Sequence, residues 1–176
     1  MTFRKATEKD IDRIAEIYEE IHDEIEAERI VNGWVRGVYP IRLDAEESLA
    51  AGELFVEEEA GQVVAAGKIN REQVDVYAQA AWEFDAPDDK VMVLHTLVVS
   101  PKAGGKGYGS AFVRFYEQYA REQGCPFLRM DTGEINRAAR TLYKKLGYKE
   151  VGLVESVFNG IPGMMLVCLE KKLEEE

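Results

Sequence analysis

Apolar side chains recur at helical spacing in two long segments of the chain. In residues 8–30 they lie three or four positions apart, which predicts one amphipathic helix with a buried side formed by Ile11, Ile14, Tyr18, Ile21 and Ile25. Thr7 followed by Asp10 resembles a capping box at the start of this helix. Gly107–Gln123 repeats the pattern, with Phe112, Phe115 and Tyr119 along one side.

Two shorter helices are predicted from the signals at their ends. Asp44 with Glu47 is read as the cap of a helix that ends near Gly52. Asn136–Leu146 also has helical spacing. It is closed by Gly147, because glycine readily adopts the left-handed conformation that ends many helices.

Alternating or continuous apolar residues predict the strands of a sheet. Val91–Val99 is largely apolar, as expected for a strand that is buried on both faces. ELFVEEE and QVVAAGKIN, joined by a turn at Gly61, are predicted to form a hairpin. The other predicted strands are Phe3–Lys5, Phe127–Asp131, and the pair Glu150–Phe158 and Met164–Lys171 around the turn NGIPG, with Tyr77–Phe84 as a further strand or an irregular edge. This order predicts one mixed α/β domain over residues 1–176.

Composition narrows the classes to which the protein can belong. The formal net charge of −11 argues against a nucleic-acid partner, because phosphate contacts need a basic face. The apolar runs are far shorter than the roughly 20 residues that cross a bilayer, so no membrane partner is expected. Cys125 and Cys168 have no metal-type spacing and are too few for a disulfide framework, so no metal is expected. Since the N-terminus has no signal-peptide core, a cytoplasmic protein is predicted.

The stretch SPKAGGKGYGS holds four glycines within six positions, between a predicted strand and a predicted helix. It lacks the GxxxxGK[ST] pattern, which excludes a P-loop. A dinucleotide fingerprint fits incompletely, because the glycines give GxGxG rather than GxGxxG, although Asp131 lies about the right distance downstream. The third interpretation is a pyrophosphate cradle, in which backbone N–H groups and a helix N-terminus bind a diphosphate. A plain strand-to-helix turn remains the structural alternative.

The downstream segment favours the cradle. Asn136 and Tyr143 are seven residues apart, which is two helical turns and roughly 10 Å along the axis, so their side chains share one face. Two polar groups at this spacing suit a long, thin ligand lying between the two strand–helix units.

With these two motifs the sequence resembles the GNAT superfamily of acetyl-CoA-dependent N-acetyltransferases. LVVSPKAGGKGYGS resembles the family's cofactor strand and its Q/R-x-x-G-x-G/A pyrophosphate loop, and NRAARTLYKKLGY resembles its second cofactor segment. The resemblance implies a single-domain fold with a central, mostly antiparallel sheet that is splayed at the cofactor site and flanked by helices. Gly104 departs from the pattern, which has Arg or Gln there. This departure would either weaken CoA binding or be compensated by Lys102 or Lys106.

The resemblance also implies how acetyl-CoA would bind. The opening would lie between Leu94–Val99 and Phe127–Asp131, with the pantetheine bonded to strand backbone and the diphosphate bonded to the amides of the glycine loop. The implied cofactor-binding residues are Leu97, Val98, Val99, Gly105, Lys106, Gly107, Tyr108, Gly109, Ser110 and Asn136.

The implied reaction is direct attack on the thioester by a primary amine of a small molecule or peptide terminus. An amine with a pKa of about 10.4 is protonated at pH 7, so a base or a water relay is needed. His95 is the candidate base, and strand alternation would put it on the face of Leu97 and Val99. A satisfied core histidine is the alternative. Glu83 is a second candidate, for which an exposed strand-edge acid is the alternative.

The leaving thiolate needs a proton, and Tyr143 matches the family's donor position. A packing role under neighbouring leucines is the alternative for this tyrosine. The resemblance implies that a backbone N–H near Val98 binds the oxyanion. Asn136 has two compatible roles, because capping its helix uses the side-chain oxygen and leaves the amide donors for the cofactor.

The acceptor amine is left open by the sequence. The candidate substrate-binding residues lie in segments that would surround it and are Trp34, Tyr39, Trp82 and Glu83. Because dimers are common in the family, a homodimer is an open alternative to a monomer. Two rival functions remain: a non-catalytic acyl-CoA-binding module, motivated by Gly104, and a dinucleotide-binding oxidoreductase, motivated by the GxGxG turn.

Overall fold

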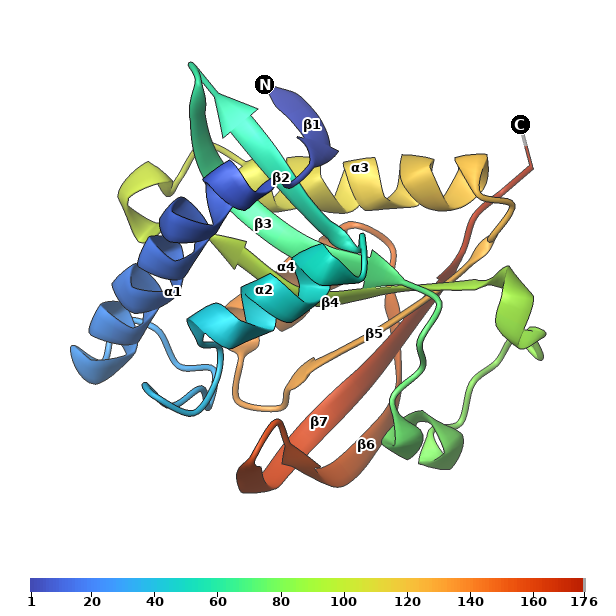
Figure 1. Cartoon of the computed structure of the whole chain (residues 1–176). Coiled ribbons are helices and arrows are strands. Elements are labelled where there is room, and N and C mark those ends of the chain that lie inside the picture. Colours follow the sequence, from blue (N-terminus) through green and yellow to red (C-terminus); the bar gives the residue numbers. More distant parts are fainter. Residues whose placement is uncertain (176) are drawn as a thin grey trace.

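A seven-stranded sheet organises the chain in the computed structural model, which describes residues 1–175 (Figure 1). Its strand order is β1-β2-β3-β4-β5-β7-β6, and every neighbouring pair is antiparallel except β4 with β5. The strands are β1 (Thr2–Lys5), β2 (Leu54–Glu59), β3 (Gln62–Asn70), β4 (Val91–Val99), β5 (Phe127–Gly133), β6 (Lys149–Phe158) and β7 (Ile161–Lys172). The helices are α1 (Ile11–Glu26), α2 (Arg42–Ala50), α3 (Tyr108–Glu122) and α4 (Arg137–Lys145). The predicted mixed α/β fold with a mostly antiparallel sheet is confirmed.

The four helices cover the two faces of the sheet. Helices α1 and α2 lie in front of β2, β3 and β4 in Figure 1, whereas α3 and α4 lie behind them. Ile14 and Ile17 of α1 are fully buried against the front face, and Phe112 and Tyr116 of α3 are fully buried against the back. Burying one such side chain contributes roughly 1.5–3 kcal/mol, so both helices are fixed by their apolar stripes. No helix among residues 1–175 is long and apolar enough to cross a membrane.

The parallel strands β4 and β5 pair over only three residues, from Val91 with Phe127 to Val93 with Arg129. Beyond that point they diverge toward the left of Figure 1. The sheet is therefore open between the second halves of the two strands, as the family resemblance implied. An open pair of strands exposes backbone groups that are hydrogen-bonded in a closed sheet.

A bulge in β4 decides which way its side chains point. Ala66 pairs with Val98 but Lys68 pairs with His95, so one extra residue of β4 lies opposite Gly67, and Thr96 has a φ of +50°. Leu97 packs on the same α3 side of the sheet as Leu94, although regular alternation would separate them. The prediction that His95 shares a face with Leu97 and Val99 is therefore wrong. His95 faces the α1 and α2 side.

Several helix boundaries differ from those expected. The first helix was predicted to reach residue 30, but α1 ends at Glu26. Its last turn carries no basic residue, and carboxylates at a helix C-terminus oppose the helix dipole. Helix α2 begins at Arg42, because Asp44 lies inside its first turn and accepts the backbone N–H of Ile41 at 2.7 Å.

Two strand predictions also need correction. The turn between β6 and β7 is only Asn159-Gly160, with φ values of +48° and +86°, so β7 begins at Ile161 rather than Met164. Tyr77–Phe84 contains no strand. It follows the irregular alternative, starting within a short 3-10 turn at Asp75–Gln79.

Candidate active site

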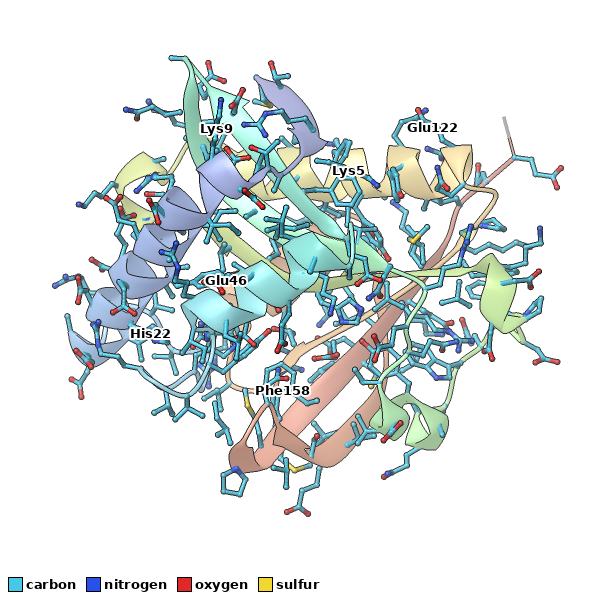
Figure 2. All side chains as sticks on the ribbon, in the orientation of Figure 1. Lys5, Lys9, His22, Glu46, Glu122 and Phe158 are labelled. Atoms are coloured by element: carbon cyan, nitrogen blue, oxygen red, sulfur yellow. The ribbon has the colours of Figure 1, made fainter. Side chains whose placement is uncertain are left out.

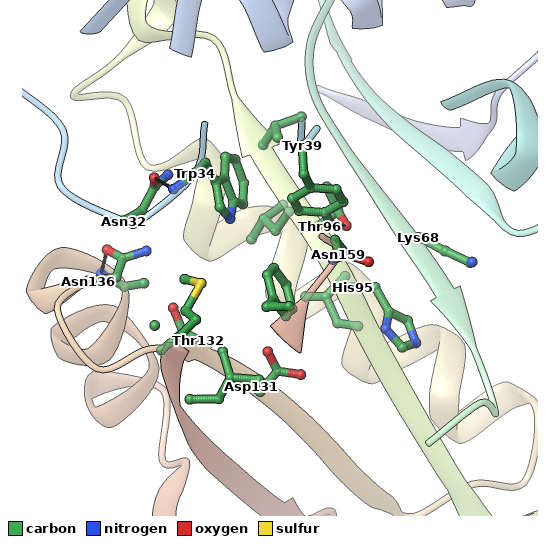
Figure 3. A pocket seen from close by; sticks show the side chains of 18 of the residues that line it. Asn32, Trp34, Tyr39, Lys68, His95, Thr96, Asp131, Thr132, Asn136 and Asn159 are labelled. Atoms are coloured by element: carbon green, nitrogen blue, oxygen red, sulfur yellow. Dashed lines mark hydrogen bonds between the residues drawn. The ribbon is translucent and has the colours of Figure 1, made fainter. Parts of the chain in front are cut away.

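The opening between β4 and β5 contains a cavity of about 790 Å³. Its walls come from the loop between α1 and α2, the second half of β4, the end of β5, α4 and the hairpin of β6 and β7. Figure 3 shows Trp34 and Tyr39 on one side of this space, with Asp131 at its base and His95 beside β4. Segments that are distant in the sequence thus meet at the place where the sheet is split.

Tyr143 lines this cavity from α4 and is only 8% exposed. Its hydroxyl has no hydrogen-bond partner among residues 1–175 and is not one of the fully enclosed side-chain atoms, so it is open to the cavity and available to a ligand. Burial, aided by the negative charge of Asp131, raises the pKa of Tyr143 above its ordinary value. The phenol therefore stays protonated at neutral pH and is available as a donor.

Asn136 lies at the start of α4 and lines the same cavity as Tyr143. Its side-chain oxygen accepts the backbone N–H of Ala139 at 3.2 Å, which caps the helix. The two amide hydrogens remain available to the cavity. Capping and ligand binding are thus compatible at this residue, as predicted.

The glycine loop presents unpaired backbone donors at the start of α3. Ala111 donates to the carbonyl of Gly107, so the N–H groups of the three preceding helical residues have no partner within the helix. Gly105 and Gly107 have φ values of +81° and +76°, which strongly favour glycine. Donors of this kind, at a helix N-terminus, fit a diphosphate.

Five of the predicted cofactor-binding residues line the cavity: Leu97, Val98, Val99, Gly109 and Asn136. The others lie next to it on the glycine loop and the first turn of α3 and are Gly105, Lys106, Gly107, Tyr108 and Ser110. Gly104 has an ordinary extended conformation, with φ −62° and ψ 160°. A Cβ at this position would lie 3.3 Å from the carbonyl oxygen of Pro101. Its neighbours would have to yield slightly to admit a side chain.

His95 also lines the cavity, and its Nε2 lies 2.7 Å from Oδ1 of Asn70. Burial, together with the positive charge of Lys68, lowers the pKa of His95 to about 4. The imidazole is therefore neutral at pH 7 and is a weak base.

Asp131 is the site residue that sequence reasoning misjudged, because it was read as an ordinary strand end or a dinucleotide-type acid. The structure puts it in the cavity, at the end of β5, where Oδ2 accepts a hydrogen bond of 2.6 Å from the Tyr77 hydroxyl. Burial raises the pKa of this carboxyl, although the bond from Tyr77 opposes the shift. Its place at the end of the predicted strand Phe127–Asp131 was the one signal available in the sequence.

The predicted acceptor residues divide into two pairs. Trp34 and Tyr39 line the cavity and stack edge to face, with ring centroids 5.7 Å apart. Trp82 lies outside it, packed on Tyr77 at 5.3 Å and under the Arg129 guanidinium at 4.3 Å. Glu83 is also outside the cavity lining and forms an ion pair with Lys149. The geometry thus supports neither an acceptor role for Trp82 and Glu83 nor a base role for Glu83.

The sequence profile of the acetyltransferase (GNAT) family matches residues 12–148 of this chain. The chain belongs to this family. Members of the GNAT family use acetyl-CoA, and the matched segment contains both cofactor motifs. The rival dinucleotide-binding interpretation is wrong, because a doubly wound sheet is parallel and this sheet has one parallel pair.

Known GNAT-family proteins resemble the chain to different extents. The uncharacterized N-acetyltransferase YhfO of Bacillus subtilis (strain 168) is 35% identical over 71 residues, which cover 40% of this chain and 48% of that protein. The chain therefore matches less than half of this relative's length.

Two solved structures share the fold. The GNAT-family acetyltransferase of Streptococcus agalactiae 2603 has a TM-score of 0.83 at 23% identity, covering 99% of this chain and 96% of its own. The structure of yncA from Salmonella typhimurium, solved with its cofactor acetyl-CoA, has a TM-score of 0.68 at 20% identity, with 100% and 95% covered.

Proposed function

We propose that this GNAT-family protein transfers the acetyl group of acetyl-CoA to a primary amine of a small molecule or peptide terminus by direct attack. The observation that carries the proposal is the buried Tyr143 side chain, whose hydroxyl is open to the cavity and has no hydrogen-bond partner among residues 1–175. It lies in the cavity between the diverging strands, two turns from Asn136. A donor there suits the protonation of a leaving sulfur.

The backbone supports cofactor binding at two places. The free amides at the start of α3 fit the diphosphate, and β4 pairs with β5 only as far as Val93, which leaves the later part of that edge of β4 without a strand partner. We propose that the pantetheine bonds to the backbone of Leu97, Val98 and Val99, with Asn136 on its other side. When bound, acetyl-CoA supplies an activated acetyl group as a thioester.

We propose that Tyr143 donates its hydroxyl proton to the leaving sulfur and that Asp131 accepts the proton of the amine, directly or through a water. Releasing a proton from an amine with a pKa of about 10.4 at pH 7 costs roughly 4–5 kcal/mol, so an acceptor with a raised pKa helps. Burial raises the pKa of Asp131, which favours its protonated form, whereas burial lowers the pKa of His95, which disfavours its protonated form. We therefore take Asp131 as the first candidate for the acceptor and His95 with Asn70 as the second.

A pair of substitutions separates the two candidate bases. We expect Asp131→Asn to lower kcat/KM about 100-fold or more, in line with general-base catalysis, and His95→Gln to lower it less than about threefold. The opposite ranking would assign the base to His95. Unchanged kcat/KM in both variants would indicate that the amine loses its proton to solvent rather than to either side chain.

The first measurement is thermal unfolding with acetyl-CoA, NAD and ATP added separately. A ligand at a hundredfold excess over its Kd adds roughly 2.7 kcal/mol, which for a chain of this size raises Tm by about 5–10 °C. We expect a shift with acetyl-CoA alone. No shift, or a shift only with NAD, would contradict the proposal.

A second candidate function, a non-catalytic acyl-CoA-binding module, is favoured by one observation. Gly104 supplies no side chain to the phosphate loop. A shift of Tm with acetyl-CoA but no turnover across a broad panel of amines would support this alternative.

A further inference from the structure

The lining of the cavity is strongly acidic. Its walls carry five carboxylates, from Asp44, Glu47, Glu72, Asp75 and Asp131. Lys68 is the one Lys or Arg of this lining within residues 1–175, and its Nζ already lies 3.8 Å from a carboxylate oxygen of Glu53. The neutral His95 adds no positive charge at pH 7. Most of the carboxylates in the lining therefore have no positive side chain beside them, and a cationic ligand would balance their charge.

We propose that the acceptor is a dication, in which an alkyl chain joins the reacting primary amine to a second cationic amine. This inference rests on the proposed acetyl transfer and adds the class of substrate. The second charge would lie at the mouth of the cavity while the first amine reaches the split between β4 and β5.

Asp131 is the carboxylate at the base of the cavity (Figure 3). The charge of Asp131 adds to burial in raising the pKa of both Tyr143 and Tyr39, so it acts on both hydroxyl groups. Tyr39 is held by a hydrogen bond between its hydroxyl and Thr96. An ammonium arriving at Asp131 thus meets the proposed acid, Tyr143, whose hydroxyl has no partner in the described chain. This unpartnered, buried group is independent of the acidic rim and marks the same cavity as a ligand site.

The rim is formed by carboxylates that lack an ion pair. Glu72 and Asp75, on the loop after β3, are exposed, and their side chains have no cationic partner within residues 1–175. Glu47 of α2 is also exposed, and its charge adds to burial in raising the pKa of Asp44. Like charges gathered at a cavity mouth attract cations and favour their residence there.

The middle of the cavity is apolar. The rings of Trp34, Tyr39 and Phe158 form a continuous edge-to-face series, with Tyr39 and Phe158 centroids 5.3 Å apart. Such a wall suits methylene groups between two charges, and its aromatic faces also attract ammonium groups. The lining thus combines the Asp131 carboxylate, an aromatic wall and the exposed carboxylates of the rim.

Three amines of equal chain length test the inference. We expect kcat/KM for 1,6-diaminohexane to exceed that for hexylamine by about tenfold or more, and to fall more steeply with added salt. A higher kcat/KM for 6-aminohexanoate would overturn the inference. It would indicate that Lys68 binds the carboxylate of the substrate. Equal kcat/KM for the diamine and hexylamine would overturn the inference and leave the proposed acetyl transfer standing.

Matched variants locate the second charge. We expect the double substitution Glu72→Gln with Asp75→Asn to raise KM for the diamine about tenfold, with kcat and the KM for hexylamine nearly unchanged. Glu122→Gln removes an exposed charge at the far end of α3, distant from Phe158 in Figure 2, and serves as the control. If Glu122→Gln raised KM for the diamine as much as the double substitution does, the preference for the diamine would come from the net charge of the protein. That result would overturn the rim site.

Calorimetry keeps this inference separate from the proposed function. With CoA-saturated protein, we expect 1,6-diaminohexane to bind about tenfold more tightly than hexylamine. Tighter binding without turnover of any amine would contradict the proposed transfer but support the dicationic site. No difference in binding would overturn the site whatever the turnover.

Discussion

Tyr143 and Tyr148 are neighbours that show how position decides the role of a residue. Their ring centroids are 6.0 Å apart, and neither hydroxyl has a hydrogen-bond partner among residues 1–175. Only Tyr143 lines the cavity. The sequence predicted the tyrosine of interest from its spacing to Asn136, but it could not predict that Asp131 acts on the same hydroxyl.

The pair supplies a controlled test of the proposed acid. We expect Tyr143→Phe to lower kcat about 100-fold or more, because it removes the proposed proton donor, while the Kd of acetyl-CoA changes less than about twofold. Tyr148→Phe removes a hydroxyl that is buried outside the cavity, also without a partner, and should leave kcat unchanged. Steady-state kinetics and ligand titration measure both. Wild-type kcat in Tyr143→Phe would remove this residue from the mechanism.

His95 links protonation to stability. Its pKa is about 4 in the folded protein against about 6.5 in an unfolded chain, so the unfolded state binds more protons between these values. The free energy of unfolding therefore decreases as pH falls from 6.5 toward 4. His95 accounts for up to about 3 kcal/mol of this decrease. We expect His95→Gln to lose less stability over that range than the wild type. Parallel denaturation profiles of the two proteins would contradict the lowered pKa.

At the scale of elements, the strand β4 and the helix α3 carry the features that shape the cofactor site. The bulge opposite Gly67 turns His95 away from Leu97, and a Cβ at Gly67 would lie 2.8 Å from the Phe112 ring. The apolar pattern predicted the strand and the helix, because that pattern depends on near neighbours. The bulge depends on how β3 and α3 pack against β4, and the pattern therefore gave no sign of it.

The two ends of α3 allow a test of the glycine loop. Gly107 and Gly124 have φ values of +76° and +72°, and a Cβ on either would meet no atom within 4 Å. Alanine at either position should cost roughly 1–2 kcal/mol of stability from backbone strain. We expect only Gly107→Ala to weaken acetyl-CoA binding, by about tenfold, since its Cβ would stand in the proposed cradle. Equal Kd values for the two variants would place the diphosphate elsewhere.

At the scale of the whole molecule, one sheet brings distant segments together around a split. Tyr77 and Asp131 are 54 positions apart, and their hydrogen bond joins the loop after β3 to the end of β5. The fold class and the splay were predictable because two motifs and the element order resemble a known family. The exclusion of Trp82 from the cavity was not predictable, because its contacts with Arg129 and Tyr77 hold it in an irregular segment that no local pattern describes.

The split predicts a pattern of hydrogen exchange. Amides of Leu97–Val99 that face the opening should exchange more slowly once acetyl-CoA is bound, because the cofactor would act as an added strand. Amides of Val91–Val93 already pair with β5 and should not change. Mass spectrometry with and without acetyl-CoA measures both segments. Uniform slowing along β4 would indicate general stabilisation rather than binding in the split.

The sequence by itself determined most helices and strands, the glycine-rich loop before α3 and the spacing of Asn136 with Tyr143. These features depend on residues within one or two turns of each other, so their pattern is legible along the chain. Only the tertiary structure decided on which face of the sheet His95 lies and that Asp131 lines the cavity. It also decided that the loop after β3 contributes carboxylates to the rim of the cavity. Those arrangements depend on strand register and on contacts between segments that the sheet brings together, and no local periodicity encodes them.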